Sequence, residues 1–305
     1  GAVFGFVTAT ALMLIICMIW FGVGRKDRNL SIKNMIFFGM PLLGFHVVML
    51  LLSNVSLFFV KSLSNVNIAN IQAGYYTASI TIANILPTLI NPIKDALFPF
   101  ISESYSKNKG LETSYYSKSA IRYALIALVP LIAIISSTSY ELMKLIYSSE
   151  YEKSGDVMAA LIIAMGFFGL YSLISTIIIS LGKPKTATKI AFFVILIMII
   201  GNLLLVPKLL AYGAAISASL SLFFGLIISS LYLHKINAGL PNTLSFIRIL
   251  TTGFVVYFIS KVFIVSGIML LFKYLFLIIL YIIILLLIKE LKKEDLLFIK
   301  DTIIR

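Results

Sequence analysis

The stretch from Gln72 to Phe100 constrains the fold of this chain most, because it is long and apolar yet polar along one side. At about 1.5 Å per residue, a helix of this length exceeds the ~30 Å of hydrocarbon in a bilayer. Its polar residues recur at alternating steps of three and four, which places them on one stripe of a helix. They are Gly74, Thr77, Thr81, Asn84, Thr88, Asn91 and Asp95, with Lys94 at the edge of the stripe.

Three prolines, Pro87, Pro92 and Pro99, interrupt the same stretch. A proline has no backbone N–H and its ring clashes with the carbonyl four residues earlier, so each one frees a carbonyl group that needs another partner. A membrane helix that is polar on one side and broken by proline is typical of the wall of a hydrated cavity or of a contact between helices. This stretch is therefore the first candidate for a functional surface.

The composition indicates a polytopic membrane protein. Of the 305 residues, 60% are hydrophobic and 12% are charged, and the mean hydropathy is +1.06. Soluble domains normally have about a quarter of their residues charged. The single cysteine, Cys17, and the two histidines, His46 and His234, predict no disulfide framework, no metal site and no cofactor.

The apolar runs predict an all-α fold with about nine transmembrane helices. The expected spans are Ala2–Val23, Met35–Val60, the stripe helix, Ser119–Ser139, Asp156–Leu181, Thr186–Val206, Tyr212–Leu233 and two that share Phe246–Ile288, with a turn at Ser266 and Gly267. No loop between them offers room for a soluble catalytic domain. The tail from Lys289 onward is amphipathic and is expected to lie on anionic lipid.

The net charge of +13 fits membrane orientation and anionic lipid, and no nucleic-acid partner is expected, because the basic residues sit in short loops between apolar spans. Seventeen of them fall in alternate loops and the tail, against six in the remaining loops. The rich set is Arg25, Lys26, Arg28, Lys33, Lys107, Lys109, Lys118, Lys183, Lys185, Lys189, Lys235, Arg248, Lys289, Lys292, Lys293, Lys300 and Arg305. By the positive-inside rule the C-terminus is cytoplasmic, and Gly1 lies on the outer side of the cell membrane.

An ordered set of short motifs resembles the C-terminal half of polysaccharide flippases of the multidrug/oligosaccharidyl-lipid/polysaccharide exporter superfamily. In order they are F-G-M-P-L-L (Phe38–Leu43), A-G-Y-Y-T-A (Ala73–Ala78), L-I-Y-S-S-E-Y (Leu145–Tyr151), L-G-K-P-K (Leu181–Lys185), G-N-L-L-L-V-P-K (Gly201–Lys208) and Y-G-A-A-I-S-A-S-L-S (Tyr212–Ser221). Each motif is weak alone, but the ordered set covers nearly the whole chain.

The resemblance implies a two-lobe exporter of which this chain supplies one lobe. Residues 1–34 would hold the last helix of a cropped N-terminal lobe and a linker, and residues 35–234 the six-helix C-terminal lobe. Residues 235–288 would form two extra helices, and residues 289–305 the cytoplasmic tail. A chain that opens at Gly1 directly into a span agrees with an N-terminally cropped protein.

The function that this resemblance implies is transport of a polyprenyl-diphosphate-linked oligosaccharide across the cell membrane by alternating access. Its partners would be that substrate, membrane lipid, the N-terminal lobe, and glycan polymerases or transferases. No catalytic constellation is present in the sequence, so we expect a transporter and not an enzyme. An ion-coupled multidrug antiporter of the same superfamily, or a membrane glycosyltransferase or polymerase, remains the alternative.

The charges deepest in the expected spans are Lys94 and Asp95, followed by Arg122 one turn into the next helix. A charge inside a bilayer is costly and is a functional candidate by default, and Arg suits bidentate phosphate contacts. Alternatively, Lys94 snorkels to the headgroups with Asp95 as its counter-charge, and Arg122 is an ordinary positive-inside anchor. In a flippase, Lys94 and Arg122 would neutralise the diphosphate.

The remaining candidates for the cavity wall are neutral. Asn91, Thr88, Asn84 and Thr81 belong to the polar stripe, and His46 lies inside the second span. For His46 we expect a buried neutral side chain bonded to a neighbouring helix, with a proton-relay role as the alternative. Small residues at Gly213, Ser217, Ser221 and Gly225 predict helix packing, and Asn202 is expected to bond across helices. The face with Gly169, Ser172, Thr176 and Ser180 fits either packing or substrate contact.

Overall fold

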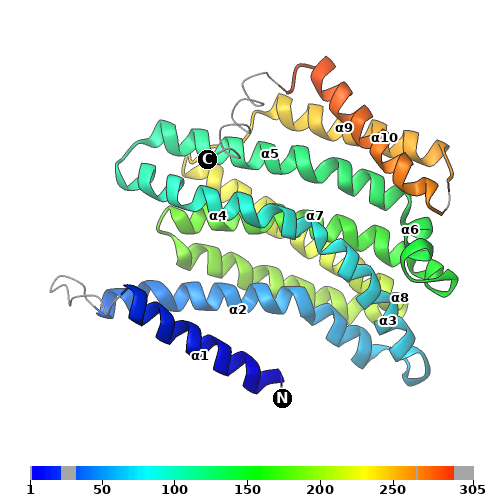
Figure 1. The fold of residues 1–305 in the computed structure, drawn as a ribbon, viewed down its shortest axis with the longest axis horizontal. Helices are drawn as coiled ribbons and strands as arrows, with labels where there is room; N and C mark the ends of the chain where they lie inside the picture. Colours follow the sequence, from blue (N-terminus) through cyan, green and yellow to red (C-terminus); the bar gives the residue numbers. More distant parts are fainter. Residues whose placement is uncertain (1, 22–31, 266, 292–305) are drawn as a thin grey trace. The chain divides into compact units, whose positions relative to one another are not determined.

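The computed structural model describes residues 2–21, 32–265 and 267–291, and these residues are almost entirely helical (Figure 1). The chain divides into two units, residues Gly1–Met40 and Pro41–Arg305. The first unit holds α1 (Ala2–Phe21) and the beginning of α2 (Ile32–Leu63). The second unit holds the rest of α2 and every later helix, and therefore all of the residues from which a site is built below.

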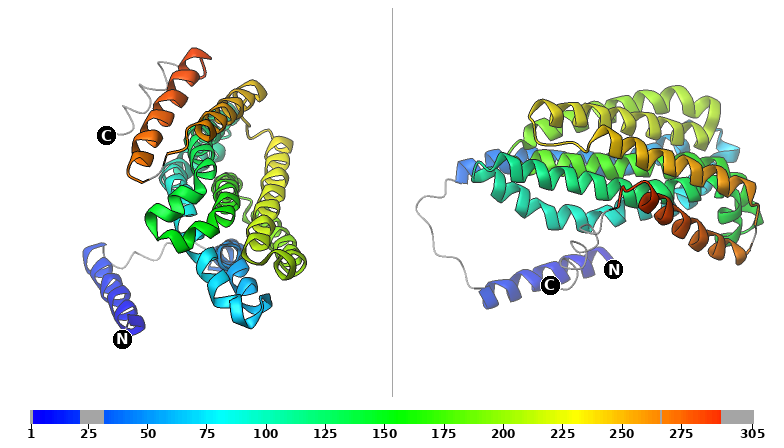
Figure 2. Two further views of the ribbon diagram at one scale, coloured as in Figure 1. Left: turned by 90° about the vertical axis from the view of Figure 1, so that its right-hand side faces the viewer. Right: turned by 90° about the horizontal axis from the view of Figure 1, so that it is seen from above.

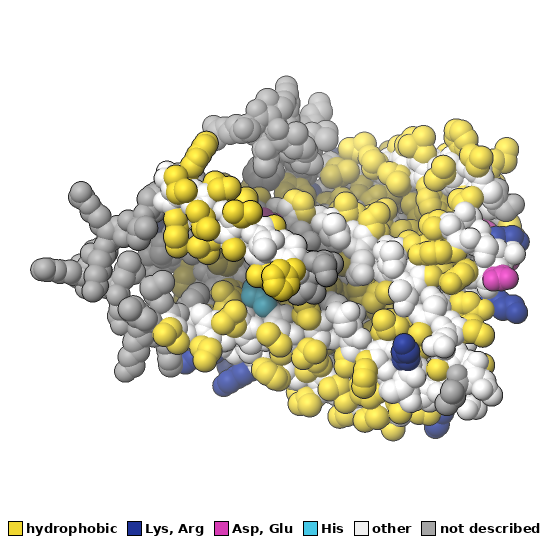
Figure 3. Space-filling view, turned by 60° about the horizontal axis from the view of Figure 1, so that its bottom comes forward, with side chains coloured by type: hydrophobic (Ala, Val, Ile, Leu, Met, Phe, Trp, Pro, Cys, Tyr) yellow, Lys and Arg dark blue, Asp and Glu magenta, His cyan; other side chains and the backbone are white. Residues whose placement is uncertain are grey.

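The second unit continues through a series of long helices with one short outer turn. They are α3 (Val66–Ala83), α4 (Ile85–Ser106), α5 (Gly110–Ser137), α6 (Ser139–Ile146), the 3₁₀ helix η1 (Ser149–Ser154), α7 (Gly155–Ser180), α8 (Pro184–Lys235), α9 (Thr243–Val262) and α10 (Met269–Leu287). Within the described residues, six helices are long and apolar enough to cross a membrane: α2, α5, α7, α8, α9 and α10. Figure 3 shows a face on which hydrophobic side chains far outnumber charged ones.

The long helix α8 is two crossings joined at a break. Leu210 has a φ of 54° and a ψ of −134°, which no helix tolerates, and Pro207 lies one turn before it. The halves then run side by side (Figure 2), and Ser217 Oγ donates to the Met198 carbonyl at 3.0 Å. With α8 counted twice, and with α1 and the α3–α4 pair added, the described residues contain the nine expected crossings. The all-α polytopic fold predicted from the sequence is confirmed.

Small residues explain how closely the two halves of α8 and its neighbours pack. A Cβ on Gly201 would lie 2.5 Å from Ser217 Oγ, and one on Gly225 would lie 2.6 Å from Val194. Asn202 is fully buried, and its Nδ2 donates to Ser56 Oγ on α2 at 3.1 Å and to the carbonyl of Met198 in its own helix at 2.8 Å. The packing function expected for the small-residue face and the interhelical bond expected of Asn202 are both present.

Helix α7 forms the centre of this unit, with α8, α4, α5 and α3 packed around it (Figures 1 and 2). Leu161 and Ile162 are fully buried within it, as is the ring of Tyr171. Gly166 and Gly169 face α4 and α5, where an added Cβ on Gly166 would lie 2.3 Å from Ile132. Because glycine has no side chain, α4 can approach α7 closely at these two positions, which brings the polar stripe of α4 near α7.

Helices α9 and α10 pack on α5 and on each other. At one end of this group, Ser137 Oγ donates to Ser260 Oγ at 2.6 Å, and Lys273 Nζ donates to the carbonyls of Ser260 and Phe263 at 2.8 and 2.6 Å. Lys273 therefore satisfies the last carbonyls of α9, which the helix itself leaves unbonded. Gly267, with a φ of 69°, lies in the turn between the two helices, as expected; Ser266 is outside the described residues.

At the other end of the group, one buried carboxylate joins three segments. Glu290 follows α10 and is 3% exposed, and its Oε1 accepts from Arg122 Nε on α5 at 3.0 Å. Its Oε2 lies 3.5 Å from an amino nitrogen of Arg248 on α9, and its carbonyl also accepts from Arg122. The rest of the amphipathic tail, from residue 292, lies outside the described residues, as does the basic segment 22–31.

We predict that Glu290→Gln loosens α9 and α10 from α5, because it leaves two arginines without their shared counter-charge. Removing one partner of a buried ion pair costs about 3 kcal/mol or more. Thermal unfolding in detergent measures the loss. The matched control is Glu103→Gln, whose pair with Lys107 is more than half exposed and is expected to contribute little to stability. Equal unfolding midpoints for the two variants would contradict a structural role for the cluster.

Candidate functional site

The polar stripe expected as one helix is two helices, and the break between them shapes the site. Helix α3 ends at Ala83 and α4 begins at Ile85, with Asn84 between them at a φ of −63° and a ψ of −10°. Pro87 accounts for the break, because its ring clashes with the Ala83 carbonyl and its missing N–H leaves that carbonyl unbonded. Pro92 and Pro99 lie farther along inside α4.

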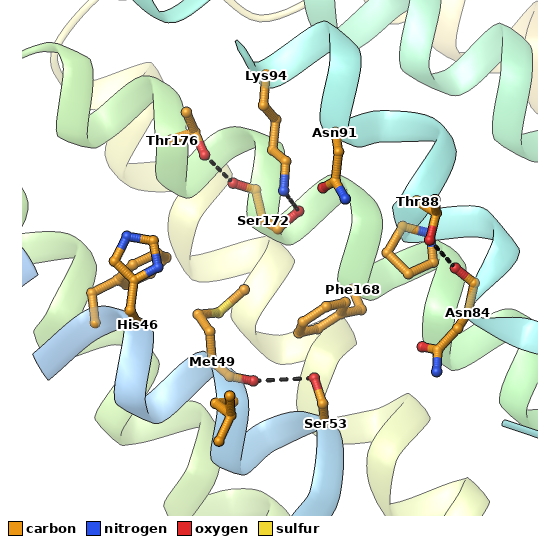
Figure 4. Close-up of a pocket in the computed structure, with 13 residues that line it drawn as sticks. His46, Met49, Ser53, Asn84, Thr88, Asn91, Lys94, Phe168, Ser172 and Thr176 are labelled. Atoms are coloured by element: carbon orange, nitrogen blue, oxygen red, sulfur yellow. Dashed lines mark hydrogen bonds between the residues drawn. The ribbon is translucent and has the colours of Figure 1, made fainter. Parts of the chain in front are cut away.

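A pocket of about 530 Å³ lies beside this break, entirely within the second unit (Figure 4). Helix α7 contributes its bottom through Phe168, Ser172 and Thr176, while α2 and the α3–α4 helix contribute the two sides. The other lining residues are Phe45, His46, Met49, Leu50 and Ser53 from α2, and Asn84, Pro87, Thr88, Asn91 and Lys94 from the broken helix. The lining combines aromatic rings, neutral polar groups and a single positively charged ammonium group.

That charge is the Lys94 ammonium, and its bonding is sparse. Nζ donates to Ser172 Oγ at 3.3 Å, and Ser172 Oγ donates in turn to the Gly169 carbonyl at 2.9 Å. Within the described part of the chain, Lys94 has no ion-pair partner. Three donors on an ammonium group with one neutral acceptor leave capacity for an anionic ligand. Lys94 lies well inside α4, twelve residues before the helix ends at Ser106, and its side chain is half-buried.

Hydroxyl and amide side chains in the pocket differ in how they are bonded. The hydroxyls donate to carbonyls of their own helices: Thr88 to Asn84 at 2.8 Å, Ser53 to Met49 at 3.1 Å, and Thr176 to Ser172 at 2.9 Å. Each hydroxyl oxygen can therefore only accept a further bond. The side chains of Asn84, Asn91 and His46 have no hydrogen-bond partner among the described residues, so both their donors and their acceptors are open to a ligand.

The structure brings five of the eight candidate residues together in this pocket: Lys94, Asn91, Thr88, Asn84 and His46. The expectation of a buried, bonded His46 is wrong, because this side chain is exposed at the pocket and makes no hydrogen bond to a described residue. Neighbouring Phe45 takes the buried position on α2 instead: it is 4% exposed and also lines the pocket.

The other three candidates lie elsewhere. Arg122 binds Glu290 and holds α9 and α10 in place, so it is not available to this pocket. Asp95 follows Lys94 in the helix but is exposed on another side and does not line the pocket. Thr81 lies on α3, before the break, and donates to the Thr77 carbonyl at 2.7 Å. The polar stripe was expected on one straight helix. Because the helix is broken at Asn84, the residues of the stripe before and after the break do not line the same pocket.

Sequence reasoning left the contribution of α7 open and missed Phe168 altogether. Ser172 and Thr176 line the pocket, whereas Gly169 and Ser180 are buried in packing. The four-residue spacing of Phe168, Ser172 and Thr176 was the available signal, because it places all three on one face of a helix. Nothing in the sequence alone indicated that this face meets α2 and α4. Among the described residues no cluster of potential metal ligands occurs.

Three comparisons relate the chain to known proteins. Residues 3–156, just over half of the chain, match the family described as "Polysaccharide biosynthesis protein". An uncharacterized membrane protein of Methanocaldococcus jannaschii is 26% identical over 167 residues, which cover 55% of this chain and 33% of the relative. The solved structure of lipid II flippase MurJ in an inward closed conformation has a TM-score of 0.71 at 17% identity, and the match covers 98% of this chain and 62% of that one.

The structural match establishes the fold, and its coverage agrees with one lobe of a two-lobe exporter plus flanking helices. This chain spans about a third of the length of the archaeal relative and less than two thirds of the flippase chain. The resemblance to polysaccharide exporters noted from the ordered motifs is confirmed by the family match. This multi-pass membrane chain belongs to the polysaccharide biosynthesis protein family.

Proposed function

We propose that the protein containing this chain flips a polyprenyl-diphosphate-linked oligosaccharide from the cytoplasmic to the outer leaflet by alternating access. The observation that carries the proposal is the pocket in which Lys94 supplies the one ammonium group among neutral polar and aromatic side chains. A lipid-linked glycan has the matching parts: an anionic diphosphate, a neutral polar sugar and a tail that can remain in lipid. The family match and the fold shared with a lipid II flippase support it.

Lys94 would neutralise the diphosphate. An anion cannot enter a partly dehydrated cavity without a cationic partner, and at an effective dielectric near 20 one charge pair at about 4 Å is worth roughly 4 kcal/mol. Lys94 is held by a single neutral bond to Ser172, so a phosphate oxygen can take the remaining donors without breaking an existing ion pair. This makes Lys94 a group whose binding capacity is largely unused until substrate arrives.

The neutral residues toward the helix break would contact sugars. Asn84 and Lys94 are ten residues apart, about 15 Å along a helix, which spans a diphosphate and the first sugar. Asn91 and Asn84 offer free amide groups to sugar hydroxyls, and the exposed part of Phe168 offers an apolar surface to a sugar ring. The pocket described here would be one half of a larger transport cavity, and the N-terminal lobe of the same protein would supply the other half.

The alternatives need chemistry that this pocket does not provide. A cation antiporter would place a carboxylate in the cavity, but the only acid near the stripe, Asp95, is not among the lining residues. A glycosyltransferase or polymerase would present acidic or histidine residues on a sizeable loop. Glu150 and Glu152 lie instead on the short η1 turn, where Glu152 pairs with Lys144 at 2.9 Å.

The proposal predicts a specific order of activity among Lys94 variants of the full-length protein. Lys94→Ala and Lys94→Glu should lower flipping of a labelled lipid-linked glycan in proteoliposomes by tenfold or more, since roughly 1.4 kcal/mol corresponds to a factor of ten. Lys94→Arg should keep much of the activity, because the charge remains. Lys261→Ala is the matched control, because this lysine lies at the end of α9 near Tyr257 and should be dispensable.

Rates must be expressed per correctly inserted molecule, since a lysine that only anchors the helix would affect insertion instead. Parental turnover by Lys94→Ala and Lys94→Glu at matched insertion would exclude Lys94 from substrate binding and remove the main support for this function.

The proposed orientation, with the C-terminus cytoplasmic and Gly1 outside, predicts how single cysteines are labelled. After Cys17→Ser, cysteines at Asn108 and Lys185 should react with an impermeant thiol reagent only from the cytoplasm. One at Ser149, in η1, should react only from outside. Lys185 and Ser149 are separated by one crossing, α7, so labelling of both from the same side would refute the topology.

A further inference from the structure

His46 is a titratable group in the pocket to which the lysine-based argument gives no role. It projects from α2, and Figure 4 shows its ring and the Lys94 side chain directed from opposite sides toward the α7 segment with Ser172 and Thr176. The ring has an edge contact with Phe45, with centroids 5.7 Å apart and an interplanar angle of 71°. This contact restrains the imidazole without occupying either nitrogen.

Both nitrogens of His46 are unbonded to any described residue. An imidazole in a membrane helix that serves only packing normally has its N–H bonded to a neighbouring helix, because an unpaired polar group in a low-dielectric environment costs free energy. Asn202 meets that requirement through Ser56, whereas His46 does not. Its position at an open pocket indicates that the missing partner is water or a ligand.

Among the described residues, few charged groups lie around His46. Lys94 on α4 is the other titratable residue of the pocket lining, and α7 contributes only Phe168, Ser172 and Thr176 there. The beginning of α8 contacts α2 near His46, where Thr188 Oγ1 donates to the Pro41 carbonyl at 2.7 Å. The charged residues of that segment, Lys185 and Lys189, are both exposed. No acid of the pocket lining competes with a ligand for a protonated imidazole.

We propose that His46 is a second phosphate-binding group, whose protonated imidazole shares the diphosphate with Lys94 from the opposite wall of the pocket. The inference rests on the proposed function and adds to it a pH-dependent affinity for substrate. A diphosphate esterified at both ends carries two negative charges, and Lys94 neutralises one of them. His46 supplies the second from α2, so that a bound diphosphate bridges α2 and α4.

The sign of the pH effect follows from this charge balance. Only a protonated imidazole offers a positive charge to a phosphate, and an adjacent anion favours that form. Substrate binding should therefore take up a proton, so the affinity rises as pH falls through the range in which histidine titrates, and declines as pH rises above it.

The test is equilibrium binding of a short-chain prenyl-diphosphate N-acetylglucosamine to the full-length protein at about pH 6 and about pH 8. Both phosphates of this probe are esterified, so the probe itself does not titrate in that range. The parent protein should bind about tenfold more tightly at the lower pH, because the imidazole contributes its positive charge only when it is protonated. His46→Gln should bind with the same affinity at both values, close to that of the parent at about pH 8.

Two further variants separate a charge from a packing role. His46→Lys, which is charged throughout, should bind at the higher pH as the parent does at the lower one; a residue needed only for packing would not be rescued in this way. His234→Gln changes the other histidine, which is exposed in the last turn of α8, and should leave the pH profile of the parent unchanged.

The outcomes distinguish this inference from the proposed function. If the parent binds the probe but its affinity is the same at both pH values, or if His46→Gln keeps the pH dependence, His46 is not a phosphate-binding group, and the lysine-based site stands. If the parent does not bind the probe at either pH, the proposed substrate class is wrong, and the role of His46 falls with it.

Discussion

The bonding of charged side chains inside a bilayer is the constraint on which this structure depends, because an unpartnered charge there is expensive. Three buried or half-buried cations of the second unit meet this constraint in different ways. Lys273 donates to the terminal carbonyls of α9, and Arg122 shares the carboxylate of Glu290 with Arg248. Lys94 has a single neutral acceptor, Ser172. The first two arrangements are complete within the described residues, whereas the ammonium of Lys94 keeps donors for a further acceptor.

A broken helix places the incompletely bonded lysine where a ligand can reach it. Pro87 ends the hydrogen-bonded run at Ala83, so α4 leaves the break at Asn84 and lies against α7 at Gly166 and Gly169. The Lys94 side chain reaches Ser172 on α7 inside the pocket, whose sides are formed by α2 and the α3–α4 helix. The pocket therefore depends on two features together: the glycines of α7, which let α4 approach, and Pro87, which breaks the helix before α4.

Much of the fold could be predicted from the sequence because the hydrophobic runs and the loop charges report directly on membrane crossings. The nine crossings, the packing face of the second half of α8 and the interhelical bond of Asn202 all follow from spacing. The break at Asn84 could not be placed, since three prolines lay within reach and only Pro87 ends a helix. The break also removed Thr81 from the expected wall of the cavity.

The candidate site was predictable only as far as one helix could be considered alone. Lys94, Asn91, Thr88 and Asn84 share a face, and they line the pocket. Arg122 has a similar depth in the next helix, but its partner Glu290 is 168 residues away, so no local pattern revealed the pair. His46 looked like a core histidine because its helix is apolar, yet its side chain is exposed at the pocket, where the neighbouring Phe45 is the buried residue.

Photo-crosslinking of substrate to the pocket tests the central claim most directly. A benzophenone amino acid placed at Asn91 in the full-length protein should attach covalently to a lipid-linked glycan labelled in its sugar, and unlabelled substrate should compete. The same group at Phe254, an exposed apolar position on α9, should give little adduct, and competitor should not reduce it. Equal labelling at the two positions, or labelling at Asn91 that competitor leaves unchanged, would show that the glycan does not occupy this pocket.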